Sequence, residues 1–395
     1  MNRYLLAGSA AVALALGAGA ANAQAKFEVK VGGDAYFEAG FVDQDRDQGL
    51  RSTEFRNRMR LVVTPTAKAD NGLEYGARLR LRSVGGGSAG RTTDNDRAYI
   101  FAQGTFGQVQ LGVVNSFNDQ TYITSPQDYL PLGIYDGVTA WIGGAATGNA
   151  PLFRGADIGG GLASLNGSLL AQSLTVENNA TKLVYISPRF AGFQAGFSYT
   201  PRNDSSNTDV NRVKPVISSN YNTTFTDLVE VGANYVNNFG GVDFKASAGY
   251  FWGKAADDVA GTNLKNLNAW QVGAQVGYAG FTVGGGYLDY GKSGQNDVTG
   301  LFTESARVWT AGVQYATGPI VVGANYKEGK DAGDVAIRGN RKLQVVEVGV
   351  GYTVAPGLTL QAQYDYFKVD TDLSTATVDR DDKGNVVMVR SVLAF

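Results

Sequence analysis

Six arginines at alternating positions are the residues of this sequence best suited to electrostatic chemistry. They fall in two short stretches, EFRNRMRLVV at 54–63 and EYGARLRLRS at 74–83. The six are Arg56, Arg58, Arg60, Arg78, Arg80 and Arg82. Arginine stays charged at physiological pH and binds carboxylates and phosphates through a rigid fork of donors. Two such rows predict a surface that attracts anions or sets up an electric field.

The spacing of these arginines predicts two β-strands. Successive side chains of a strand point to opposite faces, so a period of two puts all six arginines on one face. The other face is then apolar, with Phe55, Met59, Leu61, Val63, Tyr75, Ala77, Leu79 and Leu81. A soluble sheet would bury this apolar face and expose the arginines. A sheet in lipid would turn it to hydrocarbon and direct the arginines into a water-filled interior.

Composition excludes several classes of function. The 395 residues include no cysteine and no histidine, which removes disulfides, thiolate chemistry, His-based triads and His metal sites. Lys plus Arg is 34 against 36 for Asp plus Glu, so nothing favours nucleic acid as a partner. We expect no enzyme, no cofactor, no metal ion and no catalytic residue.

The first residues predict export. A basic start at Arg3 precedes a soft apolar run, and Ala21-Asn22-Ala23 resembles a cleavage site. We expect a cleavable signal peptide at 1–23 and one domain at 24–395. No later apolar run approaches the length of a membrane-spanning helix.

The rest of the chain alternates in the manner of sixteen strands. They are expected at 26–41, 52–66, 73–83, 95–103, 107–114, 179–189, 193–200, 226–237, 242–253, 268–278, 281–291, 304–316, 319–328, 342–354, 358–369 and 386–395. Seven short turns alternate with eight long polar connections. The short turns are expected at 68–72, 104–107, 191–193, 239–242, 279–281, 317–319 and 355–357. An even number of strands with this alternation is typical of a transmembrane barrel, which has short periplasmic turns and long external loops.

The first and last strands fit closure of such a barrel. In the first, Phe37 and Phe41 alternate with charged residues such as Glu38. In the last, Val387 and Val389 alternate with Arg390. Burying these charges in a protein core would cost several kcal/mol for each unpaired ion, whereas a water-filled interior avoids that cost. Pairing the two strands would remove both sheet edges, as lipid requires.

These features together resemble an alphaproteobacterial general porin over essentially the whole mature chain. The resemblance rests on the signal, the opening strand FEVKVGGDAYFEAGF, sixteen strands, a long loop after the fifth, and the final SVLAF. It implies an all-β, 16-stranded antiparallel barrel in the outer membrane, assembled as a homotrimer. It also implies that Phe395 is the signal read by the barrel-assembly machinery, and that small hydrophilic solutes and ions pass through the channel. Outer-membrane lipid and lipopolysaccharide would surround it.

The loop at 115–178 is expected to narrow the channel. Sixty-four residues are too many for an ordinary connection, and porins of this type fold the corresponding loop into the barrel. Its carboxylates Asp119, Asp128 and Asp136 are expected to face the six arginines across the constriction. Such opposed charges would set a transverse field that sorts solutes by charge and dipole. Glu28, Asp34 and Glu54 are expected partners of the arginines. The alternative for the arginines is a position near the rim, on lipid phosphates or in solvent.

An acidic stretch at 43–54 matches part of a calcium-loop count, with Asp43, Asp45, Asp47 and Glu54 at positions 1, 3, 5 and 12. Gln48 stands where that loop needs glycine, so we expect a solvated hairpin.

Two alternatives to general diffusion remain open at this stage. One is a solute-selective channel in which the arginines guide anions. The other is a barrel adhesin with a filled, non-conducting interior.

Overall fold

The computed structural model describes residues 26–47, 50–84, 92–130, 141–142, 179–217, 224–258, 264–295, 304–331, 340–372 and 381–395. The expected signal peptide at 1–23 lies outside these residues, as do Asp136 and the whole second half of the long loop. Nothing in the described part of the chain forms a helix long and apolar enough to cross a membrane.

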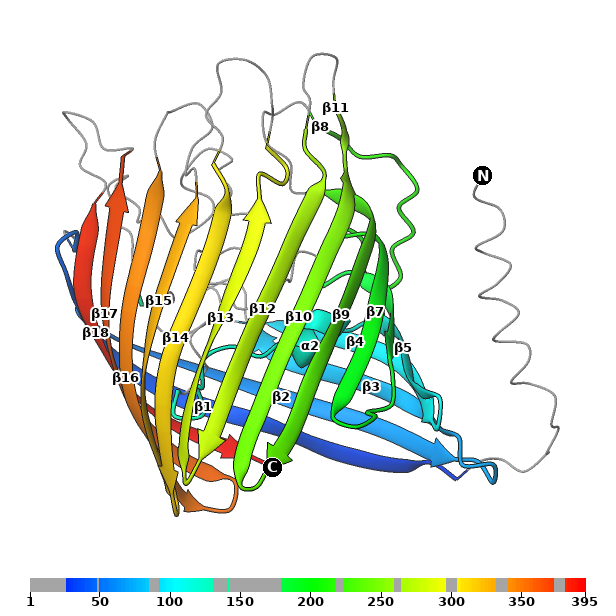
Figure 1. The fold of residues 1–395 in the computed structure, drawn as a ribbon, viewed down its shortest axis with the longest axis horizontal. Coiled ribbons are helices and arrows are strands. Elements are labelled where there is room, and N and C mark those ends of the chain that lie inside the picture. The colour runs from blue at the N-terminus through cyan, green and yellow to red at the C-terminus, as the bar shows by residue number, and fades with distance from the viewer. Residues whose placement is uncertain are drawn as a thin grey trace.

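Sixteen antiparallel strands of the described chain form one closed barrel (Figure 1). They are β1 (Glu28–Gln44), β2 (Thr53–Lys68), β3 (Glu74–Val84), β4 (Thr92–Gly104), β5 (Gly107–Val113), β6 (Thr181–Ile186), β7 (Phe193–Arg202), β9 (Phe225–Phe239), β10 (Val242–Ala255), β12 (Leu267–Tyr278), β13 (Phe281–Gly291), β14 (Ala306–Thr317), β15 (Ile320–Asp331), β16 (Arg341–Ala355), β17 (Leu358–Thr371) and β18 (Asp382–Ala394). Each pairs with its neighbours in chain order, and β1 closes against β18. The predicted fold class is confirmed.

All sixteen strands correspond to predicted ones, with differences only at their ends. The largest difference is at the last strand, which was expected from 386 and begins at Asp382. Three short elements were not predicted: α2 (Phe117–Thr121), and the parallel pair β8 (Val216–Ile217) and β11 (Asp257–Asp258). Elements of two to five residues are too short to show a period.

The seven short turns gather at one end of the barrel, at the bottom in Figure 1, which we name the turn end. Each contains a glycine with positive φ, for example Gly192 at 89° and Gly280 at 86°. Glycine adopts this conformation without steric cost, so the chain can reverse within two or three residues. The opposite end is named the loop end.

The barrel is apolar outside and mostly polar inside. On β1, Phe37 is 51% exposed while its neighbour Glu38 is fully buried. On β18, Val389 is 52% exposed while Arg390 is 3% exposed. The alternation predicted for both strands is therefore present, in the sense that a lipid-facing barrel requires.

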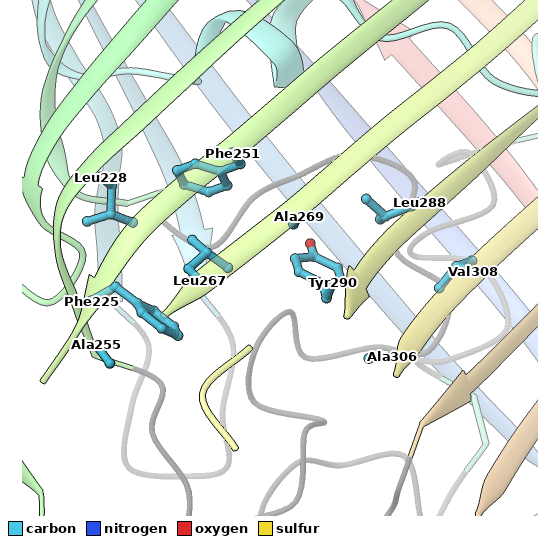
Figure 2. Close-up of a cluster of buried hydrophobic side chains, with 10 residues drawn as sticks. All are labelled: Phe225, Leu228, Phe251, Ala255, Leu267, Ala269, Leu288, Tyr290, Ala306 and Val308. Carbon is cyan, nitrogen blue, oxygen red and sulfur yellow. The ribbon is translucent and has the colours of Figure 1, made fainter. Parts of the chain in front are cut away.

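Two parts of the inner face are apolar, one on β1 and β16–β18 against Trp141 and Ile142, and the other on β9, β10 and β12–β14. Figure 2 shows the second of these clusters, at the loop end of β9, β10 and β12–β14. Its members are Phe225, Leu228, Phe251, Ala255, Leu267, Ala269, Leu288, Tyr290, Ala306 and Val308. Leu264 packs against the cluster, and the adjoining backbone is fixed by a 3.0 Å hydrogen bond from Lys265 N to Gln295 O. Apolar side chains are stable here because the chain itself covers them.

Candidate pore constriction

The six predicted arginines lie on the inner face of two neighbouring strands. On β2, the side chains of Arg56 and Arg58 are 28% and 20% exposed, while the outward Phe55 is 60% exposed. The register places Arg60 of β2 directly opposite Arg82 of β3. Like charges in direct opposition destabilise a sheet, so compensating groups must lie nearby.

Carboxylates on the flanking strands supply that compensation. Asp34 of β1 accepts from Arg60 Nε at 2.6 Å and from Arg58 Nη2 at 3.5 Å. Asp96 of β4 accepts from Arg80 Nη2 at 2.6 Å and lies 3.2 Å from Arg82 Nη1. Together these contacts hold four of the six arginines in fixed positions along the wall.

We name the inner face of β2 and β3 that carries the six arginines the arginine wall. Two further carboxylates bind its arginines. Asp94 accepts from Arg82 Nη2 at 3.1 Å. Glu38, fully buried, accepts from Arg56 Nε and from Arg390 Nη2 of the last strand. Arg78 differs from the other arginines, because it makes no ion pair with a described residue. It lines an inner recess of about 390 Å³ with Arg60, Arg80 and Lys30.

The predicted partners of the arginines are correct for Asp34 and wrong for Glu28 and Glu54. Glu28 lies 3.7 Å from Lys30, and Glu54 lies 3.9 Å from Arg51. The register explains the error, because Glu28 is opposite Thr66 near the turn end and Glu54 is opposite Gly40 near the loop end. Both fall beyond the ends of the arginine rows.

Sequence reasoning missed Glu38, Asp94 and Asp96 as partners. Glu38 shares the inward face of β1 with Asp34, so alternation alone identifies it. Asp96 was harder to identify, because the register of β3 and β4 shifts between Arg80 and Leu81. This bulge breaks the simple alternation and moves Asp96 next to Arg80.

The first part of the long loop lies inside the barrel, as expected. In Figure 1, α2 is seen between the near strands β9 and β10 and the far strands β2–β4. Ser116 caps α2 by accepting from Asp119 N at 3.3 Å, and Phe117 is fully buried. In the barrel order, strands β10–β14 stand across the lumen from β2–β4. The loop segment therefore lies against the wall opposite the arginines.

Hydrogen bonds fix this segment to strands β7, β9, β10, β12 and β14. Phe117 N donates to Ser198 Oγ of β7 at 2.8 Å, and Asn118 N donates to Glu230 Oε1 of β9 at 2.8 Å. Further anchors include Ile123 N to Ser247 Oγ on β10 at 2.7 Å, Gln275 Nε2 on β12 to Thr124 O at 2.8 Å, and Thr124 Oγ1 to Thr310 Oγ1 on β14 at 2.7 Å. These hydrogen bonds to the inner wall of the barrel therefore fix the path of the loop segment.

Glycines on the inner wall form the groove in which the loop lies. A Cβ on Gly273 would overlap Ile123 O, and a Cβ on Gly286 would lie 2.8 Å from Thr124 Oγ1. The same holds at Gly196 against Phe117, Gly232 and Gly249 against Asn118, and Gly323 and Gly349 against Tyr129. Only glycine leaves room for this close approach of loop and wall.

The two loop carboxylates that the structure describes, Asp119 and Asp128, have different neighbours. Asp128 is held to β14, with Asp128 N donating to Gln314 Oε1 at 3.0 Å and Gln314 Nε2 donating to Asp128 Oδ2 at 2.7 Å. Asp119 lies within electrostatic range of Arg97 on β4. Asp136 lies outside the described residues.

Arg97 and Lys182 are positioning residues that sequence reasoning missed. Arg97 donates to Asn115 Oδ1 where the loop begins, and to Asn179 Oδ1 where it ends, the latter at 3.2 Å. Lys182 Nζ donates to Val114 O at 2.7 Å and to Ala180 O at 2.9 Å. These two cations bring the start and the end of the loop together at the wall.

The acidic side chains of residues 43–54 do not converge on one point, as a calcium loop would require. Asp45 lies 3.8 Å from Lys383, and Glu54 accepts from Phe55 N at 2.9 Å. Among the described residues, no group of three or more acidic side chains could hold a metal ion.

Comparison with solved structures gives the same architecture. Variants of the Rhodopseudomonas blastica porin superpose with a TM-score of 0.55 at 18% identity, over 93% of this chain and 100% of theirs. Among curated proteins, an uncharacterised Rickettsia conorii protein is 27% identical over 323 residues, covering 67% of this chain and 70% of its own. An uncharacterised protein of Rickettsia bellii is 24% identical over 329 residues, with coverage of 67% and 70%.

The family model described as "Gram-negative porin" matches residues 10–372, which is most of the chain. This match agrees with the closed sixteen-stranded barrel, the apolar outer face and the polar inner face. The chain therefore belongs to the Gram-negative porin family, and its barrel is an outer-membrane channel for passive diffusion.

Proposed function

We propose that the narrowest point of this channel lies between the arginine wall of β2 and β3 and the loop segment held on the opposite wall. The observation that carries the proposal is the anchoring of residues 117–128 to β7–β14, across the lumen from the arginines. The cationic side of this constriction consists of Arg56, Arg58, Arg60, Arg78, Arg80 and Arg82. Its acidic side is Asp119 and Asp128, with Asp136 proposed to join them.

The charges of the arginine wall support a transverse field with a moderate positive excess. Six arginines stand against four neighbouring carboxylates, and one of the four, Glu38, also pairs with Arg390, so cations outnumber carboxylates here. Small hydrophilic solutes would pass by diffusion and be sorted by charge and dipole. A saturable anion site is less favoured, because most of these guanidinium groups already bind carboxylates.

The proposed location is the outer membrane, with the loop end outside the cell and the turn end in the periplasm. We propose no enzymatic activity, which is supported by family membership and by the lack of histidine and cysteine. The barrel-assembly machinery and lipopolysaccharide are proposed partners of the folded chain during and after insertion.

A homotrimer is proposed on the character of the outer wall. The chain has four tryptophans, and the outward-facing Trp252, Trp270 and Trp309 are on β10, β12 and β14. Tryptophan favours the boundary between lipid and water. The outer wall of β1–β4 carries Phe, Met, Leu and Ile instead, which suits packing against another copy. Light scattering in mild detergent measures the mass, and a monomer would contradict the trimer.

Single-channel recording together with liposome swelling tests the diffusion function. Purified protein in a planar bilayer is expected to give stepwise conductance that rises linearly with potassium chloride concentration. Liposomes containing it are expected to take up uncharged sugars at rates that fall with sugar size. A barrel that gives no conductance steps and admits no sugar would contradict the proposal and support the adhesin reading. Conductance that saturates at low salt concentration would support the alternative of an anion-selective channel.

A further inference from the structure

A row of amide side chains lies on the inner face of β4 and β5, between the constriction and the turn end. Gln120 Nε2 of α2 donates to Gln110 Oε1 at 2.8 Å, and Gln110 Nε2 donates to Gln108 Oε1 at 2.8 Å. Gln108 Nε2 donates in turn to Gln103 Oε1 at 2.7 Å, and Gln103 Nε2 donates to Glu74 Oε1 at 2.9 Å. We name Gln103, Gln108 and Gln110 the amide row.

These hydrogen bonds fix the orientation of each amide group. The row ends on a carboxylate, and hydrogen bonds to a charged group are stronger than those between neutral groups. A glutamine amide has two N–H donors, and its oxygen has two lone pairs. Among the residues that the structure describes, Gln103 and Gln108 each use one N–H group in the row. The second N–H group of each amide is therefore available to a solute in the lumen.

Phe101 supplies an aromatic ring beside the amide row. Its outward neighbour Ile100 is 57% exposed, so alternation directs Phe101 inward. The register places Phe101 directly opposite Gln110 of β5 on one side and Gly76 of β3 on the other. A Cβ on Gly76 would lie 3.0 Å from Phe101 Cζ, so the ring lies against the backbone of β3. Because glycine has no side chain, the half-buried ring stays uncovered on that side.

A recess of about 360 Å³ continues from the amide row to the turn end. Its lining includes Gln103, Gln108 and a third amide, Gln194 of β7. The volume falls within the range of roughly 300–1,000 Å³ that is usual for small-molecule sites. The charged side chains of the lining are Lys68 and Glu74, one of each sign. The recess therefore favours neither anions nor cations, in contrast to the arginine wall.

An uncharged sugar matches these groups. A pyranose ring presents C–H groups on its faces and hydroxyl groups around its edge. The C–H groups pack against an aromatic ring, and each hydroxyl both donates and accepts hydrogen bonds, as an amide does. We propose that Phe101, the amide row and the recess form a binding site for uncharged sugars on the turn side of the constriction, which we name the sugar site. This inference rests on the proposed channel function and adds a solute class and the residues that bind it.

Block of the potassium chloride current by a sugar in single-channel recordings tests the sugar site. The probe is maltose, and the comparison is polyethylene glycol of the same hydrodynamic size, whose ether oxygens accept hydrogen bonds but cannot donate them. In the wild type, maltose is expected to reduce the current to a plateau as its concentration rises. Polyethylene glycol is expected to reduce the current without a plateau. A maltose effect that matches the polyethylene glycol effect would overturn the sugar site.

Two variants remove the two parts of the site separately. Phe101→Leu keeps an apolar side chain and removes the aromatic ring, whereas Q103A/Q108A removes two amides. Each is expected to raise the maltose concentration for half-maximal block by about threefold to tenfold. Because only folded channels conduct, the recordings report on folded protein.

The matched control is Phe197→Leu, on the outer face of β7, where Phe197 is 42% exposed. Its half-maximal block is expected at the wild-type maltose concentration. An unchanged value in either site variant, or an equal rise in the control, would overturn the sugar site. The current without sugar separates this result from the channel function. A channel that conducts but shows no saturable block contradicts the sugar site alone, whereas the absence of any conductance would overturn both proposals.

Discussion

The indole nitrogen of Trp141 donates a 2.8 Å hydrogen bond to Glu38 Oε1, which joins the long loop to the first strand. The same carboxylate accepts from Arg56 of β2 and from Arg390 of the last strand. Glu38 therefore connects three features at the closure seam of the barrel: the loop, the arginine wall and the β1–β18 pair. Gly40 makes room for this contact, because a Cβ there would overlap the Trp141 ring.

Replacing Trp141 with phenylalanine removes the donor and keeps an aromatic ring against Gly40. A hydrogen bond to a charged group contributes about 1.5–3 kcal/mol, so the loop should be held less firmly at the seam. We expect larger open-channel current noise in single-channel recordings. Trp309→Phe, on the outer face of β14, is the control and should behave as the wild type. Equal noise in both variants would count against an anchoring role for Trp141.

Substitution of Gly273 with alanine tests the groove that receives the loop. The added methyl group would overlap Ile123 O, so the loop must shift away from β12. We expect an altered single-channel conductance, with a loss of stability of about 1–3 kcal/mol from overpacking. Gly277→Ala on the same strand is the matched control, since its Cβ meets nothing closer than Asp243 Cβ at 3.4 Å. A wild-type conductance in Gly273→Ala would show that the loop does not depend on this contact.

Deletion of Phe395 should impair assembly of the barrel. Its backbone pairs with Gly33 in both directions, at 2.8 and 3.0 Å, and its side chain is 53% exposed on the outer face. We expect a strong fall in folded protein in the outer membrane, measured by heat-modifiable migration in gels. Phe395→Tyr keeps the ring and the backbone bonds and should assemble normally. A normal yield of the truncated chain would refute the proposed signal.

Single cysteines test the orientation, because the chain has none of its own. Asn266→Cys at the loop end should react with an impermeant thiol reagent on intact cells. Asn71→Cys, in a tight turn, should react only after the outer membrane is permeabilised. The reverse pattern would invert the proposed topology.

Alternation predicted all sixteen strands and the inward face of the arginines, because a period of two is a local property of a strand. The path of the long loop is not local. Phe117 bonds to Ser198, and Thr124 to Thr310, so the anchors are far apart in sequence. Nothing near Gly273 in the chain indicates that it faces Ile123. Likewise, the bulge at Arg80 and Leu81 that brings Asp96 into the site depends on pairing between strands.

We propose that the arginines of β2 and β3 line the ion path. For one unit charge at about 7 Å and an effective dielectric near 40, the interaction is roughly 1 kcal/mol, which is several-fold in relative permeability. Serine at Arg56, Arg58, Arg78 and Arg80 should therefore shift selectivity toward cations. Because a Debye length of about 8 Å at physiological salt is comparable to a pore radius, the shift should shrink near 1 M salt.

The reversal potential across a planar bilayer under a potassium chloride gradient measures this shift directly. The control replaces Lys26, Arg51, Lys68 and Arg212, four exposed cations in connections or near strand ends, with serine. We expect a cation-directed change in the reversal potential at low salt in the fourfold arginine variant and little change in the control. An unchanged reversal potential in the arginine variant at low salt would contradict this proposal and place these arginines away from the ion path.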